Sequence, residues 1–241
     1  MDQKYYNISY AESPFGTLNQ YMTRTYGWMA AGLLVTFATA LLTVTTPLFE
    51  LMFSTGLVFL LSIAELVLVA VLSARVERLQ PTTATGLFFA YAVLNGINLS
   101  TYFIIYDLST LILAFLVGTV YFGVMAVYGA RTQRDLSGWG INLMGALIAI
   151  ILTSLVGGLI GMLTGAGFGM MDIVLCAVSV LVFMLFTAYD TQNLKYYYAY
   201  YGGDASMLHK SSIIGALSLY LDYINIFLYI VRIVGRSRRN N

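Results

Sequence analysis

Long runs of apolar residues, separated by short polar breaks, fill most of the chain. A helix that crosses a bilayer needs about 20 mostly apolar residues. Such runs lie at roughly 26–47, 52–74, 86–106, 109–130, 139–163, 172–190 and 212–234. The breaks carry Pro, Gly or Asp and leave no room for a second domain. The pattern therefore predicts an all-α polytopic membrane protein with seven transmembrane helices.

The amino-acid composition is typical of an integral membrane protein. Of its 241 residues, 59% are apolar and only 10% are charged, whereas a soluble domain carries about 25% charged residues. This balance excludes a soluble globular protein, and a net charge of +1 gives no overall attraction to nucleic acid. We expect an N-terminal segment at 1–25, a transmembrane domain at 26–234 and a basic tail at 235–241, with the lipid bilayer as the main partner.

The positive charges indicate an orientation. The N-terminal segment and the second, fourth and sixth loops each hold two Lys or Arg residues, and the other loops hold none. Because cytoplasmic loops are enriched in Lys and Arg, the N-terminus is predicted to be cytoplasmic. Seven crossings would then put the arginines of the tail outside. Either the last helix returns to the cytoplasm or these arginines are tolerated outside. The first 25 residues are polar, so no cleaved signal peptide is expected.

Three carboxylates lie in apolar runs, namely Glu65, Asp190 and Asp222. An ionisable group inside a membrane is costly, by about 2.5–3.5 kcal/mol on insertion scales, and is a functional candidate by default. Asp222 belongs to a polar stripe, since Ser218 and Asn225 precede and follow it at helical spacing. This stripe predicts a central last helix that faces other helices or a watery cavity. The simpler alternative is a buried Asp that only bonds a neighbouring helix.

For Asp190 and Glu65, the spacing of polar residues alone does not indicate a role. Asp190 ends its run, where an interfacial or capping role is common. Glu65 precedes Arg75 by ten residues, which places it about 15 Å from the expected cytoplasmic end of its helix. Asp222 has a comparable depth. A second polar stripe on the third helix contains Tyr91, Asn95, Asn98 and Tyr102, and either lines the same site or bonds other helices.

Carboxylates with amide and hydroxyl neighbours suit Ca²⁺ or protons far better than zinc. If Asp190 and Asp222 lie close together, their like charges favour one shared proton. A protonated pair would clamp two helices, and deprotonation would open a cation route.

An intramembrane aspartyl protease would use the same two residues. Tyr189 and Asp190 fit its first motif, but the residues before Asp222 lack its Gly-x-Gly pattern, and none of the three prolines supplies its Pro-Ala-Leu element. We expect no enzyme activity and no cofactor, with Ca²⁺ as a permeant or bound ion.

Two C-terminal strings carry a resemblance to a known family. FTAYDTQNLK at 186–195 and GALSLYLDYINIFLYIVRI at 215–233 resemble the Bax inhibitor (transmembrane Bax inhibitor motif) family, in particular its bacterial inner-membrane branch. Further similar strings are YGWMAAGLL at 26–34, LSARVERL at 72–79, NGINLSTYFIIY at 95–106 and YGARTQRDLSGWG at 128–140. The resemblance therefore extends over the chain.

The resemblance implies a central last helix wrapped by six others and a pH-sensitive Ca²⁺ leak governed by an aspartate pair. By motif, the pair is Asp190 and Asp222, which form the pH switch and the cation ligands. The expected ion path adds Glu65, Asn225 and Ser218, with Asn95 and Asn98 as pore-lining candidates and Arg75 or Arg78 as the gating partner. The alternative is a non-conducting regulator, because some relatives modulate a membrane protease or suppress cell death. The expected location is a bacterial inner membrane.

Overall fold

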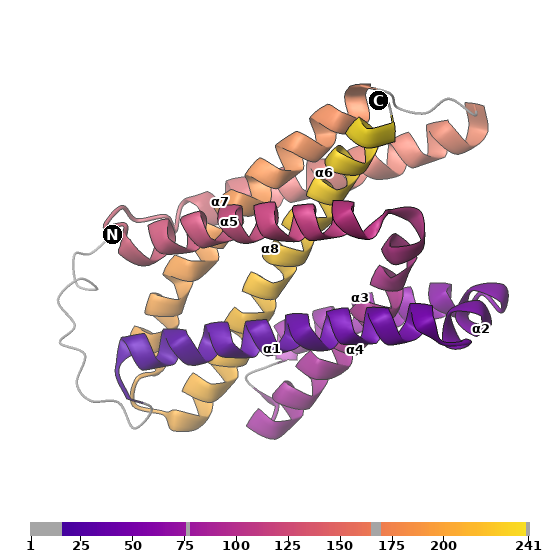
Figure 1. The fold of residues 1–241 in the computed structure, drawn as a ribbon. Helices are drawn as coiled ribbons and strands as arrows, with labels where there is room; N and C mark the ends of the chain where they lie inside the picture. The colour runs from indigo at the N-terminus through magenta and orange to yellow at the C-terminus, as the bar shows by residue number, and fades with distance from the viewer. Residues whose placement is uncertain (1–15, 76–77, 165–169, 240–241) are drawn as a thin grey trace. The chain divides into compact units, whose positions relative to one another are not determined.

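The computed structural model describes residues 16–75, 78–164 and 170–239. Within these ranges the chain forms eight α-helices and no strand (Figure 1). The helices are α1 (Leu18–Thr45), α2 (Leu48–Ser54), α3 (Leu57–Arg75), α4 (Pro81–Ile105), α5 (Leu108–Arg131), α6 (Trp139–Thr164), α7 (Met170–Tyr201) and α8 (Ala205–Arg239). The prediction of an all-α polytopic membrane protein is confirmed.

The second predicted helix is a bent pair rather than one straight helix. α2 and α3 meet at 90°, whereas α1 and α4 to α8 are each long and apolar enough to cross a membrane. The break falls at Gly56, whose φ of +72° is a backbone conformation that residues with a side chain rarely adopt. The described part of the chain therefore has six straight candidate spans, or seven if the bent pair counts as one.

The last two helices are longer than their apolar runs. α7 continues past Asp190 to Tyr201, about three further turns, so the helix extends beyond the apolar run that ends at Asp190. α8 starts after Asp204, whose carboxylate accepts hydrogen bonds from the backbone N–H groups of Ser206 and Met207 and so caps the helix. It also runs on through residues 235–239 of the basic tail.

The helices form two compact units. The first contains Met1–Asp107 and Asn193–Tyr220, and the second contains Leu108–Gln192 and Leu221–Asn241. α7 and α8 therefore contribute one part to each unit.

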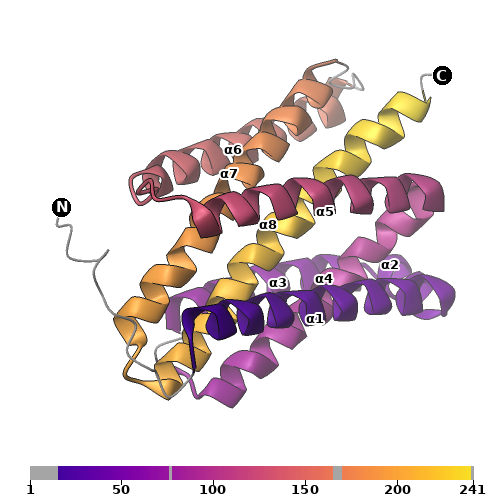
Figure 2. The ribbon, with the colours of Figure 1, turned by 60° about the vertical axis from the view of Figure 1, so that its left-hand side comes forward.

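In the first unit, α1 packs along α4, and α4 also packs against α3 (Figure 2). Hydroxyl pairs join α1 to the first half of α8: Tyr21 with Ser211 at 3.0 Å, Thr25 with Ser212 at 2.9 Å, and Thr36 with Tyr220 at 2.6 Å. Lipid supplies no hydrophobic drive between helices, so interhelical hydrogen bonds of this kind help to hold the bundle together.

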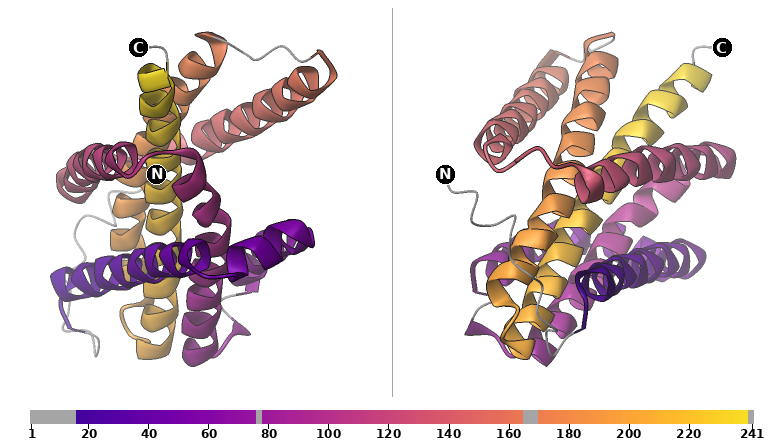
Figure 3. Two further views of the ribbon diagram at one scale, coloured as in Figure 1. Left: turned by 45° about the vertical axis from the view of Figure 1, so that its right-hand side comes forward. Right: turned by 90° about the vertical axis from the view of Figure 1, so that its left-hand side faces the viewer.

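The second unit contains α5 and α6, which Figure 3 shows from two sides. Its helices are joined by a close backbone approach and a small apolar cluster. Gly129 of α5 faces the backbone of Ala188 on α7. Leu143 and Ile150 of α6 share a buried cluster with Val182 of α7. These contacts fix the part of α7 that leads to Asp190.

α8 is the most buried of the candidate spans. In its most apolar stretch 67% of the residues are buried, against 17–44% in the other five straight spans. The other helices expose many large apolar side chains, as expected for surfaces that face lipid. The last helix is therefore the least exposed of the candidate spans, and its central place among six others stays a prediction.

Candidate functional site

The second unit holds a buried carboxyl group on α8. Asp222 is 4% exposed, and among the described residues its Oδ2 is the only buried side-chain nitrogen or oxygen atom without a hydrogen-bond partner. A buried polar atom without a partner is costly, and native proteins keep few of them. This atom therefore marks Asp222 as a site where a proton or a cation would be stabilised.

Two side chains of α7 face Asp222. Asp190 lies close enough for its charge to act on the Asp222 carboxyl, and the Thr187 hydroxyl lies within hydrogen-bonding reach of it. Asp190 is half-buried and Thr187 is buried. The structure thus brings Asp190 and Asp222 together in one unit, and these are the two residues that the family resemblance implies as a pair. Sequence reasoning missed Thr187, although it stands one helical turn before Asp190 on the same face.

The Thr187 hydroxyl has only one proton to donate. Its Oγ1 donates to the backbone carbonyl of Phe183 at 2.9 Å. While this bond persists, Thr187 can only accept from Asp222, which requires a protonated carboxyl. An ionised carboxylate instead needs the Thr187 proton for itself. The two protonation states of Asp222 therefore call for different hydrogen bonds between α7 and α8.

The polar neighbours of Asp222 on α8 are partly engaged. Asn225 is half-buried, and its Nδ2 donates to the backbone carbonyl of Leu221 at 2.8 Å, so this bond leaves the amide oxygen unused. Ser218 is half-buried one turn before Asp222 on the same helix. Both side chains carry oxygen atoms of the type that hard cations prefer.

A second polar cluster lies in the first unit, between α3 and α4. Asn95 and Asn98 each donate their Nδ2 to a different oxygen of Glu65, both at 2.5 Å. Ser62 donates to Oδ1 of Asn98 at 3.1 Å, and the Tyr91 hydroxyl also hydrogen-bonds to Glu65. The polar stripe on the third predicted helix is therefore real, and it serves to hold one carboxylate.

Of the two predicted gating arginines, the structure describes the side chain of Arg78 only. Arg78 is exposed, just before α4. Arg75 is the last residue of α3, and its side chain lies outside the part of the structure that is described. The role of these arginines stays a prediction.

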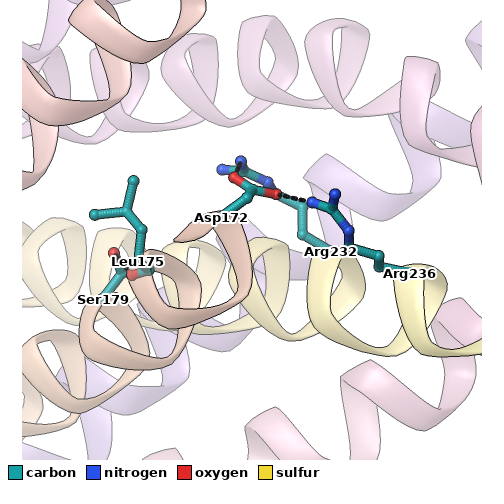
Figure 4. Close-up of polar contacts among 5 residues, drawn as sticks. All are labelled: Asp172, Leu175, Ser179, Arg232 and Arg236. Atoms are coloured by element: carbon teal, nitrogen blue, oxygen red, sulfur yellow. Dashed lines mark hydrogen bonds and ion pairs between the residues drawn. The ribbon is translucent and has the colours of Figure 1, made fainter. Parts of the chain in front are cut away.

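An ion-pair cluster near the start of α7 was missed by the sequence analysis (Figure 4). Asp172 accepts a hydrogen bond from Arg232 through Oδ1 and one from Arg236 through Oδ2, the latter at 3.1 Å. The two arginines are one turn apart, so they share a face of α8. Arg232 also lies over the ring of Tyr229, 5.8 Å from its centroid. The sequence did contain an indication of this cluster, because one acidic residue lies near the start of α7 and two arginines lie near the end of α8.

The donor set of the described residues limits the metal chemistry. No group of three or more His, Cys, Asp or Glu side chains comes together there. The oxygen atoms near Asp222 come from two carboxyls, a hydroxyl and an amide. Oxygen atoms of this kind suit a hard cation or a proton, whereas a zinc site uses nitrogen and sulfur ligands.

Comparison with known proteins places the chain in a family. Residues 18–239 match the family described as "Inhibitor of apoptosis-promoting Bax1". The chain is 42% identical over 235 residues to inner membrane protein YbhL of Escherichia coli, covering 93% of this chain and 95% of that protein. It is 37% identical over 225 residues to an uncharacterized protein of Deinococcus radiodurans, covering 92% and 94%. It is 34% identical over 222 residues to an uncharacterized protein of Rickettsia prowazekii, covering 92% and 91%. The match spans nearly the whole chain, so this integral membrane protein belongs to the Bax inhibitor family.

Proposed function

We propose that the protein is a pH-sensitive Ca²⁺ leak of a bacterial inner membrane, with Asp190 and Asp222 as its switch. The observation that carries the proposal is the buried carboxyl of Asp222, which has an unpartnered oxygen and a second carboxyl nearby. Two like charges so close inside a low-dielectric bundle repel strongly. The pair is therefore stable with one shared proton and strained without it.

The switch works through the contact between α7 and α8. With a proton present, the Asp222 carboxyl donates to a neighbouring oxygen, and Thr187 keeps its bond to Phe183. Without the proton, the two carboxylates repel each other. Thr187 can then donate a hydrogen bond to the ionised Asp222 only if its hydrogen bond to Phe183 breaks. Loss of the proton thus weakens the α7–α8 contact and offers two carboxylates to a cation. We expect flux to rise as the pH rises.

Each of the two units offers oxygen ligands to a cation. In the second unit, Asp190, Asp222 and Asn225 supply carboxyl and amide oxygens, while the Ser218 hydroxyl belongs to the first unit. In the first unit, Glu65 provides a carboxylate whose position is held by Asn95 and Asn98. A flexible set of oxygens favours Ca²⁺, which accepts irregular geometry, over Mg²⁺, which demands a near-ideal octahedron. Weak binding also suits a leak, because the ion must leave again.

The alternative is a non-conducting regulator of a membrane protease or a survival factor. In that account the hydrogen bond between Thr187 and Asp222 only locks α7 to α8, and the carboxyls carry no ion. The inner-membrane location is the same in both accounts, and it draws on the name of the Escherichia coli relative. The two accounts differ in what the purified protein does alone.

The test is Ca²⁺ entry into dye-loaded liposomes that contain only the purified protein. We expect entry above that of empty liposomes at pH 8 and less at pH 6. Asp204→Asn is the matched control, because Asp204 is exposed and Asn also caps a helix. This variant should behave as the parent does. A folded parent that passes no Ca²⁺ at either pH would rule out the leak and favour the regulator.

A further inference from the structure

A cavity outside both carboxyl clusters opens on the surface of the first unit. It has a volume of about 470 Å³ and is lined by Arg24, Gly27, Trp28 and Ala31 of α1 and by His209 of α8. None of these residues takes part in the proposed ion path. The cavity lies near the start of α1, where the polar N-terminal segment gives way to the first apolar run.

The aromatic wall of the cavity is held in place from two sides. The Trp28 ring packs edge-on against Phe89 of α4 and against His209, with centroids 6.0 Å apart in each case. His209 is itself within 3.3 Å of the Thr85 hydroxyl through Nε2. A wall fixed by three helices is preformed, which lowers the entropy cost of binding a ligand.

The polar groups of the cavity favour an anion. Arg24 is exposed and brings a permanent positive charge, and the described residues that line the cavity include no carboxylate. A guanidinium group matches the geometry of a phosphate and can donate two parallel hydrogen bonds to it. Trp rings and Arg side chains are also typical of the level at which lipid headgroups lie.

An apolar track leads away from the cavity along the same face of α1. After Ala31 this face carries Leu34, Ala38 and Leu42, and the two leucines are 71% and 61% exposed. Leu34 lies about 15 Å along the helix from Arg24, which is about half the thickness of the hydrocarbon core. A cationic pocket therefore lies next to an apolar surface that is about one leaflet deep. This arrangement fits a phospholipid, with the headgroup in the pocket and an acyl chain on the apolar surface.

We propose that the pocket formed by Arg24, Trp28 and His209 binds the phosphate of an anionic phospholipid. The guanidinium of Arg24 contacts the phosphate, Trp28 and His209 enclose the headgroup, and an acyl chain lies along Leu34. Because the N-terminal end of α1 is predicted to be cytoplasmic, the lipid belongs to the cytoplasmic leaflet, where basic residues attract anionic lipids. The proposal is independent of the Ca²⁺ leak.

The two tryptophans of the chain make a direct test feasible. Trp139→Phe leaves Trp28 as the sole tryptophan, so its fluorescence reports on the pocket. The protein is placed in nanodiscs with brominated phosphatidylglycerol or, at the same mole fraction, brominated phosphatidylcholine. Bromine quenches tryptophan at short range. We expect stronger quenching of Trp28 by the anionic lipid.

Two arginine variants identify the cause of the preference. Arg24→Gln should lower the preference for the anionic lipid by about fivefold, the effect of one basic residue near a charged surface. Arg131→Gln, at an exposed arginine that ends α5, should leave it unchanged. Trp28→Phe, which leaves Trp139 alone, should show no such preference.

Three results would overturn the proposal. These are equal quenching of Trp28 by the two lipids, a preference that survives Arg24→Gln, and a preference that is lost equally in Arg131→Gln. In nanodiscs of phosphatidylcholine alone, added inorganic phosphate should leave the Trp28 emission unchanged. A saturable change there would assign the pocket to free phosphate instead of a lipid.

Discussion

The close approach of α5 to α7 makes Gly129→Ala an informative perturbation. A Cβ added at Gly129 would lie 2.2 Å from the carbonyl oxygen of Ala188 and 2.9 Å from its Cα. These are backbone atoms, so no side-chain rotation can relieve the clash. The helices would have to separate by about 1 Å to restore ordinary contact distances.

The magnitude follows from the cost of overpacking. An extra methyl group in a packed interior costs about 1–3 kcal/mol, and the rigid partner here favours the upper half of that range. Gly123, nearly two turns earlier on α5, is the matched control because nothing lies within 4 Å of its added Cβ. Gly123→Ala should leave the protein unchanged or stabilise it by up to about 1 kcal/mol, because Ala favours a helix more than Gly.

The free energy of unfolding is measured by titrating the protein in mixed micelles with SDS and following the loss of helical circular dichroism. Midpoints at a common slope give the differences between variants. We expect Gly129→Ala to be about 2–3 kcal/mol less stable than Gly123→Ala. Equal stability of the two variants, within about 0.5 kcal/mol, would refute the packing of α5 on α7 described here.

Three further substitutions test other parts of the fold, all by the same unfolding measurement. Asp172→Asn removes the counter-charge of two arginines that are about one third exposed. This variant should lower the free energy of unfolding by about 1 kcal/mol, and high salt should remove most of that difference from the parent. A difference that salt does not change would argue against the ion pairs. Glu65→Leu leaves the amides of Asn95 and Asn98 without their acceptor and should cost about 1–3 kcal/mol, whereas a neutral result would argue against that cluster. Tyr220→Phe removes the hydroxyl that donates to Thr36 and should cost about 1 kcal/mol. No measurable change in Tyr220→Phe would mean that this hydrogen bond adds nothing to stability.

Hydropathy located every membrane helix of the described chain because bilayer thickness sets a length that apolar runs must reach. It did not show the 90° bend between α2 and α3. That bend depends on the positive φ of Gly56, and apolar residues lie on both sides of it. Hydropathy also ended the sixth helix at Asp190, because polar residues at the interface lower the average without breaking the helix.

The site residues were predictable where one helix carries the pattern. The spacing of polar residues around Asp222 and along Asn95 and Asn98 indicated buried polar faces, and the structure has both. What one helix cannot show is its partner across the bundle. The role of Asn95 and Asn98 as donors to Glu65, and the ion pair of Asp172 with Arg232, depend on which helices are neighbours.

The proton shared by two carboxyls is the central claim, and a double-mutant cycle on Ca²⁺ flux tests it most directly. Ca²⁺ entry into proteoliposomes is measured at pH 6 and pH 8 for the parent, Asp190→Asn, Asp222→Asn and the double variant, with folding checked by circular dichroism. The account predicts flux that rises with pH in the parent, loss of this dependence in each single variant, and no further change in the double variant. Flux in folded single variants that keeps the parent's dependence on pH would contradict it.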